Sequence, residues 1–278
     1  MATGHGGLGL PDGSCDCHHH IFDPRFAYTE ADRLRPPPAS ISRYEGVKAR
    51  LGIQRSVVVQ PSSYGTDNRC TLDAVARLGP GARGVAVVAP DVSDAELQRL
   101  HGGGIRGLRF NLSRGGGSPE AMVKLAPRIA ALGWHIDIHL AGDELCALED
   151  VLKGLEAPIV LDHLGRVPQP DAENHPAFRL IAGLLESGRG WVKLSQLHRD
   201  SLAGPPGYED AARLARRYSQ IAPDRLVWGT DWPHVVAAEP VDELADLALL
   251  LDWIPEEDLR RRILVENPAR LYDFPALG

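Results

Sequence analysis

Short apolar runs alternate with segments of helical period along nearly the whole chain, and this alternation limits the fold more than any other feature. Eight runs have the length and composition of buried strands: residues 15–21, 56–60, 84–88, 107–112, 135–140, 159–163, 191–194 and 226–228. Between them, apolar residues recur every three or four positions over residues 71–78, 94–101, 119–132, 144–155, 177–186, 208–221 and 241–251, as in helices with one buried face. The pattern predicts an α/β protein with a parallel sheet, and eight such units predict a closed (β/α)8 TIM barrel.

An open doubly wound sheet is the alternative fold. It would place a glycine-rich phosphate-binding turn after the first strand, whereas the chain continues there with Phe22-Asp23-Pro24-Arg25. Residues 1–13 contain five glycines and no apolar period, so we expect a flexible leader before a single barrel domain over residues 14–278. The proline-rich connections 23–42 and 198–206 are expected to be loops that wall a site.

The composition is that of a globular protein and argues against general binding to nucleic acid or anionic membranes. The formal net charge is −7, whereas such binders present basic surfaces. No apolar run is long enough to cross a bilayer, and the first residues lack the apolar core of a signal peptide, so we expect a cytoplasmic protein. The four cysteines lack paired spacing, which fits reduced thiols. The surface pattern leaves a homodimer open.

Three consecutive histidines, His18, His19 and His20, lie in the first predicted strand. Because side chains alternate along a strand, His18 and His20 are predicted to share one face, with Cys17 and His19 on the other. A same-facing pair suits a metal or catalytic site. The simpler interpretations are a tag remnant, a surface cluster or a Cys/His zinc knot, but the run is not terminal and no second ligand pair of short spacing follows it.

Polar residues also lie at or just beyond the ends of three later strands, namely His139 at the fifth, His163 at the sixth and Asp231 at the eighth. The carboxyl ends of all strands of a βα barrel meet at one mouth, so we expect these residues to converge with His18 and His20. A lone histidine is more often a satisfied core residue, but a set at four strand ends indicates a reactive site.

Three motifs resemble those of the amidohydrolase superfamily: Asp-x-His-x-His at residues 16–20, Asp-His-x-Gly at 162–165 and Gly-Thr-Asp-Trp-Pro-His at 229–234. Stretches 57–60, 65–68, 107–111, 133–135, 191–195 and 266–272 resemble its pyrone-dicarboxylate lactonase branch. The resemblance implies a hydrolase that opens a small anionic lactone, such as a dicarboxylate, muconolactone-type or sugar-acid lactone. It implies that Asp231 accepts the proton of the attacking water, while His163, His18 and His20 polarise the carbonyl group.

The resemblance leaves open whether catalysis uses a metal ion. The pyrone-dicarboxylate lactonases work without metal and have a tyrosine in place of His139, whereas metal-dependent relatives have a histidine there. His18, His20, His139 and Asp231 would supply three nitrogens and one oxygen, which suits Zn²⁺ and leaves a position for water. We therefore expect a divalent metal, zinc, with metal-independent catalysis as the alternative.

The resemblance also indicates how a small anionic substrate would be held. Arg109 and Arg199 match positions that hold carboxylates in these lactonases, and Ser62 matches a hydroxyl that assists them. A planar guanidinium can hold a carboxylate through two hydrogen bonds. Leu34 stands in place of a substrate-binding tyrosine, so the substrate itself is expected to differ. Further candidates for substrate contact are His139, Tyr64, Arg114 and His198.

Two other functions compete with lactone hydrolysis. One is a metal-dependent, non-oxidative decarboxylase of a small aromatic or muconate acid that uses the same ligands. The other is a catalytically silent barrel that binds an anion, which the lack of repeats or coiled-coil heptads disfavours. In either enzyme we expect Asp16 and Asp162 to orient the neighbouring histidines.

Overall fold

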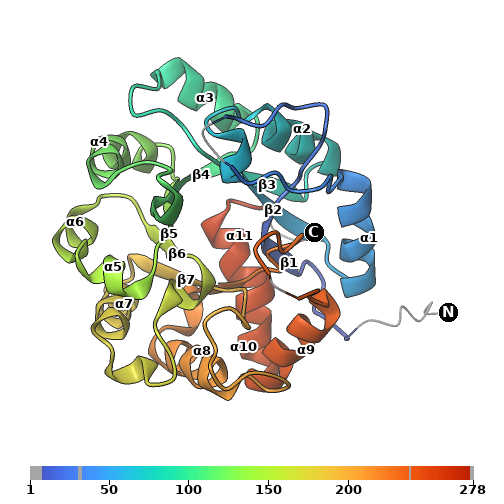
Figure 1. Cartoon of the computed structure of the whole chain (residues 1–278), viewed down its shortest axis with the longest axis vertical. Helices are drawn as coiled ribbons and strands as arrows, with labels where there is room; N and C mark the ends of the chain where they lie inside the picture. The colour runs from blue at the N-terminus through green and yellow to red at the C-terminus, as the bar shows by residue number, and fades with distance from the viewer. Residues whose placement is uncertain (1–7, 31–32, 238, 276–278) are drawn as a thin grey trace.

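Eight strands of the computed structural model pair in chain order, and every neighbouring pair is parallel. The strands are β1 (Cys15–His19), β2 (Arg55–Val59), β3 (Ala82–Ala86), β4 (Ile105–Asn111), β5 (His135–His139), β6 (Ile159–Leu161), β7 (Gly190–Leu194) and β8 (Leu226–Trp228). They form the nearly closed (β/α)8 barrel that the alternation predicts (Figure 1). The structure describes residues 8–30, 33–237 and 239–275.

Helices surround the strands as an outer ring (Figure 1). They are α1 (Ile41–Leu51), α2 (Arg69–Leu78), α3 (Asp94–Gly102), α4 (Pro119–Ala130), α5 (Gly142–Cys146), α6 (Glu149–Gly154), α7 (Pro176–Glu186), α8 (Glu209–Ile221), α9 (Glu243–Trp253), α10 (Glu257–Arg261) and α11 (Asn267–Leu271). The apolar pattern does not predict α1, α10 or α11, and it predicts one helix where α5 and α6 lie. None of the described helices is long and apolar enough to cross a lipid bilayer.

The C-terminal segment closes the end of the barrel at which the strands begin. Tyr272 is fully buried among apolar side chains of the strands. Arg55 starts β2 and donates to the backbone oxygen of Pro275, and Arg83 of β3 donates to that of Asp273. The opposite end, where the strands finish, is therefore the open mouth.

The predicted leader is described only from residue 8, and residues 1–7 lie outside the described part of the chain. At the end of the leader, the Gly13 N–H donates to Gln54 Oε1 at 2.9 Å. The chain is thus attached to the barrel just before β1 begins.

The barrel closes between β1 and the residues that follow β8. The Asp231 N–H donates to the His18 carbonyl oxygen at 2.7 Å, and the His20 N–H donates to that of Trp232 at 2.8 Å. Gly229 permits this approach, because a Cβ atom there would lie 2.6 Å from the His18 backbone nitrogen. Backbone pairing therefore places His18, His20 and Asp231 side by side.

Asp16 strengthens the same closure from within β1. Its Oδ1 accepts from the backbone N–H groups of His18 and Thr230, at 3.1 and 3.0 Å. Its Oδ2 accepts from the hydroxyls of Thr230 and Tyr44, at 2.7 and 2.9 Å. Asp16 therefore orients His18 through the backbone N–H of that residue.

Candidate active site

The predicted alternation along β1 holds for the histidines. His18 and His20 face the mouth, while His19 points to the helix layer and stacks on Tyr44 with ring centroids 3.5 Å apart. Cys17 departs from the prediction, since it packs with the strand valines that surround Tyr272. A register shift within β1 explains the departure, because an irregularity in a strand breaks the alternation of its side chains.

Three imidazoles surround one carboxylate oxygen at the mouth. The Nε2 atoms of His18, His20 and His163 lie 3.4, 3.5 and 3.9 Å from Asp231 Oδ1. All four side chains belong to buried residues. The structure therefore brings together the four residues that the sequence singles out as the reacting set, although they are separated by up to 213 positions (231 − 18) along the chain.

Two of the four residues stand on strained backbone just beyond the ends of their strands. β6 ends at Leu161, earlier than predicted, so His163 lies in the following turn with φ 54°, and Asp231 has φ 60°. The left-handed region costs a non-glycine residue on the order of 1–3 kcal/mol and persists where the surrounding structure enforces it, often at functional sites. The strain supports a functional role for both side chains.

Charge states at the mouth follow from burial. Burial raises the pKa of Asp231, but the neighbouring His20, His163 and His18 rings outweigh it and hold this pKa well below its ordinary value. Burial lowers the pKa of His18 to about 3, although Asp162 partly opposes the shift. Asp231 is thus ionised at neutral pH and is a weak base. Removing a proton from water here needs a second group that makes the water more acidic.

His20 presents a lone pair to this carboxylate. Its Nδ1 lies 2.7 Å from the Val59 carbonyl oxygen, and a carbonyl oxygen only accepts, so Nδ1 carries the ring proton. In the neutral ring, Nε2 then faces Asp231 Oδ1 as a second acceptor at 3.5 Å. Two acceptors in this position need a proton or a cation between them.

A buried set of ion pairs lies next to the imidazoles. Lys193 of β7 donates to Asp137 of β5, and its Nζ lies 3.1 Å from both Asp162 Oδ1 and His18 Nδ1. Asp162 also lies 3.1 Å from His18 Nδ1 and 3.5 Å from Arg109 Nη2. Such a contact from a carboxylate to the far side of an imidazole fixes the ring's orientation.

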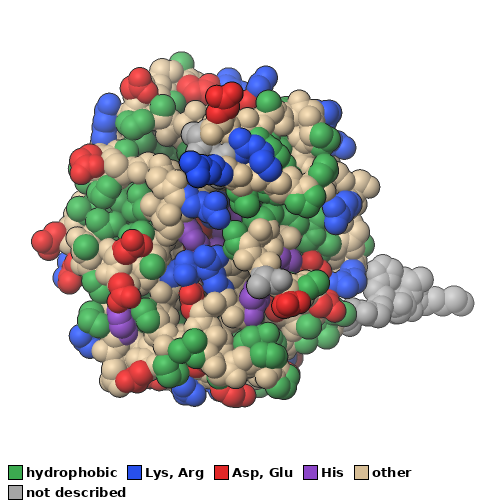
Figure 2. Space-filling model, in the orientation of Figure 1, with side chains coloured by type: hydrophobic (Ala, Val, Ile, Leu, Met, Phe, Trp, Pro, Cys, Tyr) green, Lys and Arg blue, Asp and Glu red, His purple; other side chains and the backbone are tan. Residues whose placement is uncertain are grey.

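A cavity opens from this centre towards solvent. Figure 2 shows lysine and arginine side chains around a hollow on this face, with histidines visible inside it. Five predicted substrate-contacting residues line the cavity, together with Leu34: Arg109, Arg199, Ser62, His139 and Arg114. The mouth is therefore rich in cations although the whole chain is acidic.

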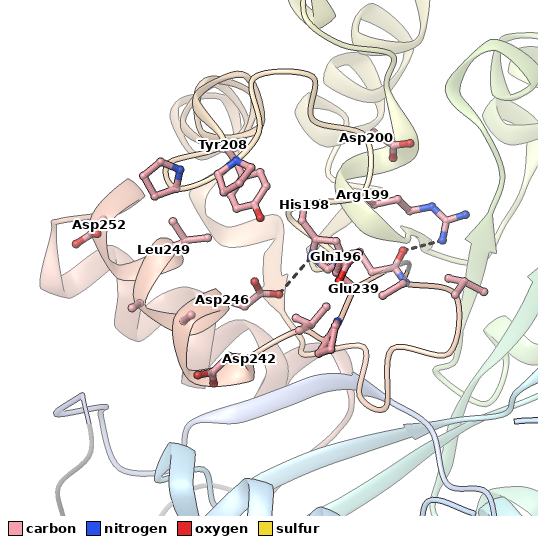
Figure 3. A pocket seen from close by; sticks show the side chains of 18 of the residues that line it. Gln196, His198, Arg199, Asp200, Tyr208, Glu239, Asp242, Asp246, Leu249 and Asp252 are labelled. Atoms are coloured by element: carbon pink, nitrogen blue, oxygen red, sulfur yellow. Dashed lines mark hydrogen bonds and ion pairs between the residues drawn. The ribbon is translucent and has the colours of Figure 1, made fainter. Parts of the chain in front are cut away.

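Tyr64 and His198 are not among the described residues that line this cavity, and their contact with substrate stays a prediction. The Tyr64 hydroxyl accepts from the Asp23 N–H at 2.9 Å and donates to the Asp23 carbonyl oxygen at 3.2 Å, so it holds the loop after β1. His198 lines a neighbouring cavity of about 1000 Å³, and its Nδ1 lies 3.7 Å from Asp246 Oδ2 (Figure 3).

Sequence reasoning assigned no role to Gln196 and Asn111, yet both line the cavity. Gln196 Nε2 donates to Asp231 Oδ2, and Asn111 Nδ2 donates to Ser62 Oγ at 3.0 Å. Asn111 is the last residue of β4, and Gln196 lies two residues beyond β7. The criterion that found the histidines, a polar residue at a strand end, could have found both.

Two groups of three side chains have ligand atoms within 4.8 Å of one another and could hold a metal ion: His18, His20 and Asp231, and His18, Asp162 and His163. The donors fit a divalent cation, because His18 Nε2 is buried without a hydrogen-bond partner in the described chain and His20 Nε2 offers a lone pair. His139 belongs to neither group, and its ring centroid lies 5.1 Å from that of His163. Its role as a ligand stays a prediction.

Histidines and an aspartate from several strand ends meet at one point in the mouth of this parallel barrel. This arrangement is typical of barrel enzymes whose reacting groups lie at the mouth. Residues 15–274 match the amidohydrolase family model, and the chain belongs to this family. The resemblance seen in the sequence motifs is thereby confirmed.

Several known proteins are similar over almost their full length. The chain is 38% identical to 4-sulfomuconolactone hydrolase of Hydrogenophaga intermedia, over 97% of this chain and 91% of that protein. It is 37% identical to 2-pyrone-4,6-dicarboxylate hydrolase of Comamonas testosteroni, over 95% and 91%. A ligand-free crystal structure of an Agrobacterium tumefaciens protein has a TM-score of 0.90 at 27% identity and covers 97% of this chain and 99% of its own.

Proposed function

We propose that this protein opens a small anionic lactone by adding water to the ring ester. One observation carries the proposal: three buried imidazoles converge on Asp231 Oδ1 beside a cavity lined by arginines. Relatives whose names specify hydrolysis of 4-sulfomuconolactone and of 2-pyrone-4,6-dicarboxylate support the same substrate class.

Asp231 transfers the proton, and His163 stabilises the negative charge that develops on the substrate. Asp231 accepts a proton from water as the water oxygen attacks the lactone carbonyl, and it returns the proton to the ring oxygen when the C–O bond breaks. The Ser195 hydroxyl lies 2.8 Å from His163 Nδ1. With Ser195 donating, His163 Nε2 carries the proton and can donate to the carbonyl oxygen as negative charge develops there.

Arg199 is the side chain that we assign to the substrate's anionic group. Its guanidinium donates to Gln196 Oε1 at 2.8 Å, and within the described chain no carboxylate lies within ion-pair distance of it. Arg109, by contrast, already lies 3.5 Å from Asp162. A partly buried guanidinium without a carboxylate partner favours an anionic ligand.

Replacing Arg199 with methionine is expected to raise KM for an anionic lactone by about 10- to 100-fold, the effect of losing a hydrogen bond to a charged group. A neutral lactone of the same ring size should lose much less. Steady-state kinetics on the two lactones checks the prediction. An equal loss for both would contradict the assignment of Arg199 to the anionic group.

We further propose that the centre holds a divalent metal, zinc, through His18, His20 and Asp231, with His139 as the fourth ligand. Bound there, the ion would lower the pKa of a water molecule towards neutrality and so compensate for the weak basicity of Asp231. The facing acceptors of His20 and Asp231 support this proposal. Catalysis without metal would instead require a proton between them.

Elemental analysis of the purified protein tests the metal proposal without any assay of activity. We expect stoichiometric zinc in the wild type, loss of zinc in His20→Asn, and loss in His139→Tyr. His101→Asn is a control, since His101 bonds the Trp134 indole and lies outside both ligand groups. Stoichiometric zinc in His139→Tyr would show that His139 is not a ligand, and a metal-free, active wild type would contradict the proposal.

A substrate panel tests the reaction class. Incubation of the protein with 4-sulfomuconolactone, 2-pyrone-4,6-dicarboxylate and a neutral lactone should consume the anionic lactones fastest.

The binding partner that we propose is thus a small anionic substrate. The cytoplasmic location, the homodimer and the lack of nucleic-acid or membrane partners remain predictions from the sequence.

A further inference from the structure

Gln196 connects two residues of the proposed site that have different tasks. Its amide nitrogen donates to Asp231 Oδ2, and its amide oxygen accepts from Arg199 Nη1 at 2.8 Å. Figure 3 shows the contact between Gln196 and Arg199 from the neighbouring cavity. Only 6% of Gln196 is exposed, so water cannot easily replace either contact. Gln196 thus lies between the proton acceptor and the anion-binding guanidinium.

We propose that Gln196 is a positioning residue through which the anion-binding Arg199 fixes the orientation of the Asp231 carboxylate. The inference rests on the proposed function, since that function gives Arg199 and Asp231 their roles. It adds that Arg199 acts on the chemical step as well as on binding.

The orientation of the Gln196 amide follows from what its two neighbours can donate or accept. A glutamine amide has one acceptor end and one donor end of nearly the same shape. A guanidinium only donates, so Arg199 selects the oxygen end and leaves the NH₂ end for Asp231. If the amide were reversed, an oxygen would face the carboxylate and repel it.

The orientation of Asp231 matters because its two oxygens have different neighbours. Oδ2 is held by Gln196, while Oδ1 lies 3.4 Å from His18 Nε2 and 3.5 Å from His20 Nε2. Rotation of the carboxylate would move Oδ1 away from the point at which the imidazoles converge. A displacement of about 1 Å in a reacting group can cost about 100-fold in rate.

The backbone at position 196 is a second, independent observation. Gln196 has φ 46°, a region that glycine and asparagine adopt far more readily than glutamine. The strain is consistent with a side chain retained for its contacts. It also means that Gln196→Gly and Gln196→Asn relieve backbone strain, which offsets part of the cost of the two lost contacts.

Single variants at position 196 separate the proposed contacts from simple space filling. We expect Gln196→Gly to lower kcat for an anionic lactone by about 10- to 100-fold with KM little changed. Gln196→Asn is one methylene shorter, so it should resemble the glycine variant. Gln196→Glu keeps the shape but places a carboxylate beside Asp231, and we expect its kcat to be lower still. A glutamate variant that is more active than the glycine variant would overturn the inference.

A double-mutant cycle tests the link to Arg199. Arg199→Met should lower kcat as well as raise KM, because the Gln196 amide oxygen then loses the donor that holds it. The double variant Arg199→Met/Gln196→Gly should have the kcat of Gln196→Gly alone, since the link is already absent. Losses in kcat that multiply in the double variant would overturn the link.

Crystal structures of the wild type and of Arg199→Met separate this inference from the proposed function, because they need no turnover. We expect the Gln196 amide to donate to Asp231 in the wild type and to lose that contact in the variant. An unchanged contact in the variant would overturn the inference even if lactones are hydrolysed. A lost contact in a protein that hydrolyses no lactone would support the inference and refute the proposed function.

Discussion

Replacing Asp231 with asparagine is expected to lower kcat/KM for an anionic lactone by about 10² to 10⁴-fold, the usual contribution of a positioned proton acceptor. Asparagine has nearly the same shape and keeps an oxygen that can accept hydrogen bonds, but it cannot take a proton from water. The backbone contact from the Asp231 N–H to the His18 carbonyl oxygen does not involve the side chain, so the barrel should still close.

Asp246→Asn is the matched control for this change. Asp246 is also buried and also lies beside a histidine, His198, but it borders the neighbouring cavity. We expect near wild-type turnover from the control and the circular dichroism spectrum of the folded wild type from both variants. Comparable turnover by Asp231→Asn and the wild type would remove Asp231 from its assigned role.

Replacing Lys193 with methionine is expected to lower the free energy of unfolding by about 3–5 kcal/mol, the cost of leaving buried carboxylates without their partner. Lys193 and Asp137 are both fully buried, and Lys193 also contacts Asp162. Burial lowers the pKa of Lys193, but the two carboxylates outweigh it and raise this pKa above its ordinary value. The ammonium is therefore charged in the folded protein, and methionine fills its space without replacing its charge.

Urea unfolding of Lys193→Met and of the double variant Lys193→Met/Asp137→Leu measures this cost. The double variant removes the carboxylate that faces the lost ammonium, while Asp162 keeps its contact with Arg109. We expect it to recover most of the lost stability, because a buried ion pair can often be replaced by apolar side chains of similar volume. A loss below about 1 kcal/mol in the single variant would show that the ion pairs do not stabilise the barrel in this way.

Much of the fold could be predicted because each βα unit leaves a local pattern. Buried parallel strands are continuously apolar and their helices have one apolar face, so both periods are visible without knowledge of partners. Three of the helices that the pattern missed or merged, α5, α10 and α11, have five residues each, whereas α1 has eleven residues but buries only Ile41, Tyr44 and Leu51. The break between α5 and α6 falls at Ala147 and Leu148, where neither proline nor glycine marks it.

The candidate site was partly predictable because residues at strand ends share one mouth. That rule placed His18, His20, His163 and Asp231 together without any contact information. Orientation within the mouth depends on partners that are distant in sequence, such as Lys193 beside His18, and a single sequence does not show such pairs. The contacts of Tyr64 with Asp23 and of His198 with Asp246 are further pairs of this kind.

Hydrolysis of 2-pyrone-4,6-dicarboxylate in water enriched in ¹⁸O, followed by mass spectrometry of the product, tests whether this barrel opens anionic lactones with water. We expect a product that has gained one water, with ¹⁸O in the newly formed carboxylate, and formation of this product about 10² to 10⁴-fold slower with Asp231→Asn. A product of unchanged mass would indicate isomerisation, and loss of CO₂ would indicate decarboxylation. Either of these, or intact lactone after incubation with the anionic lactones of the panel, would contradict the claim that this barrel opens anionic lactones with water.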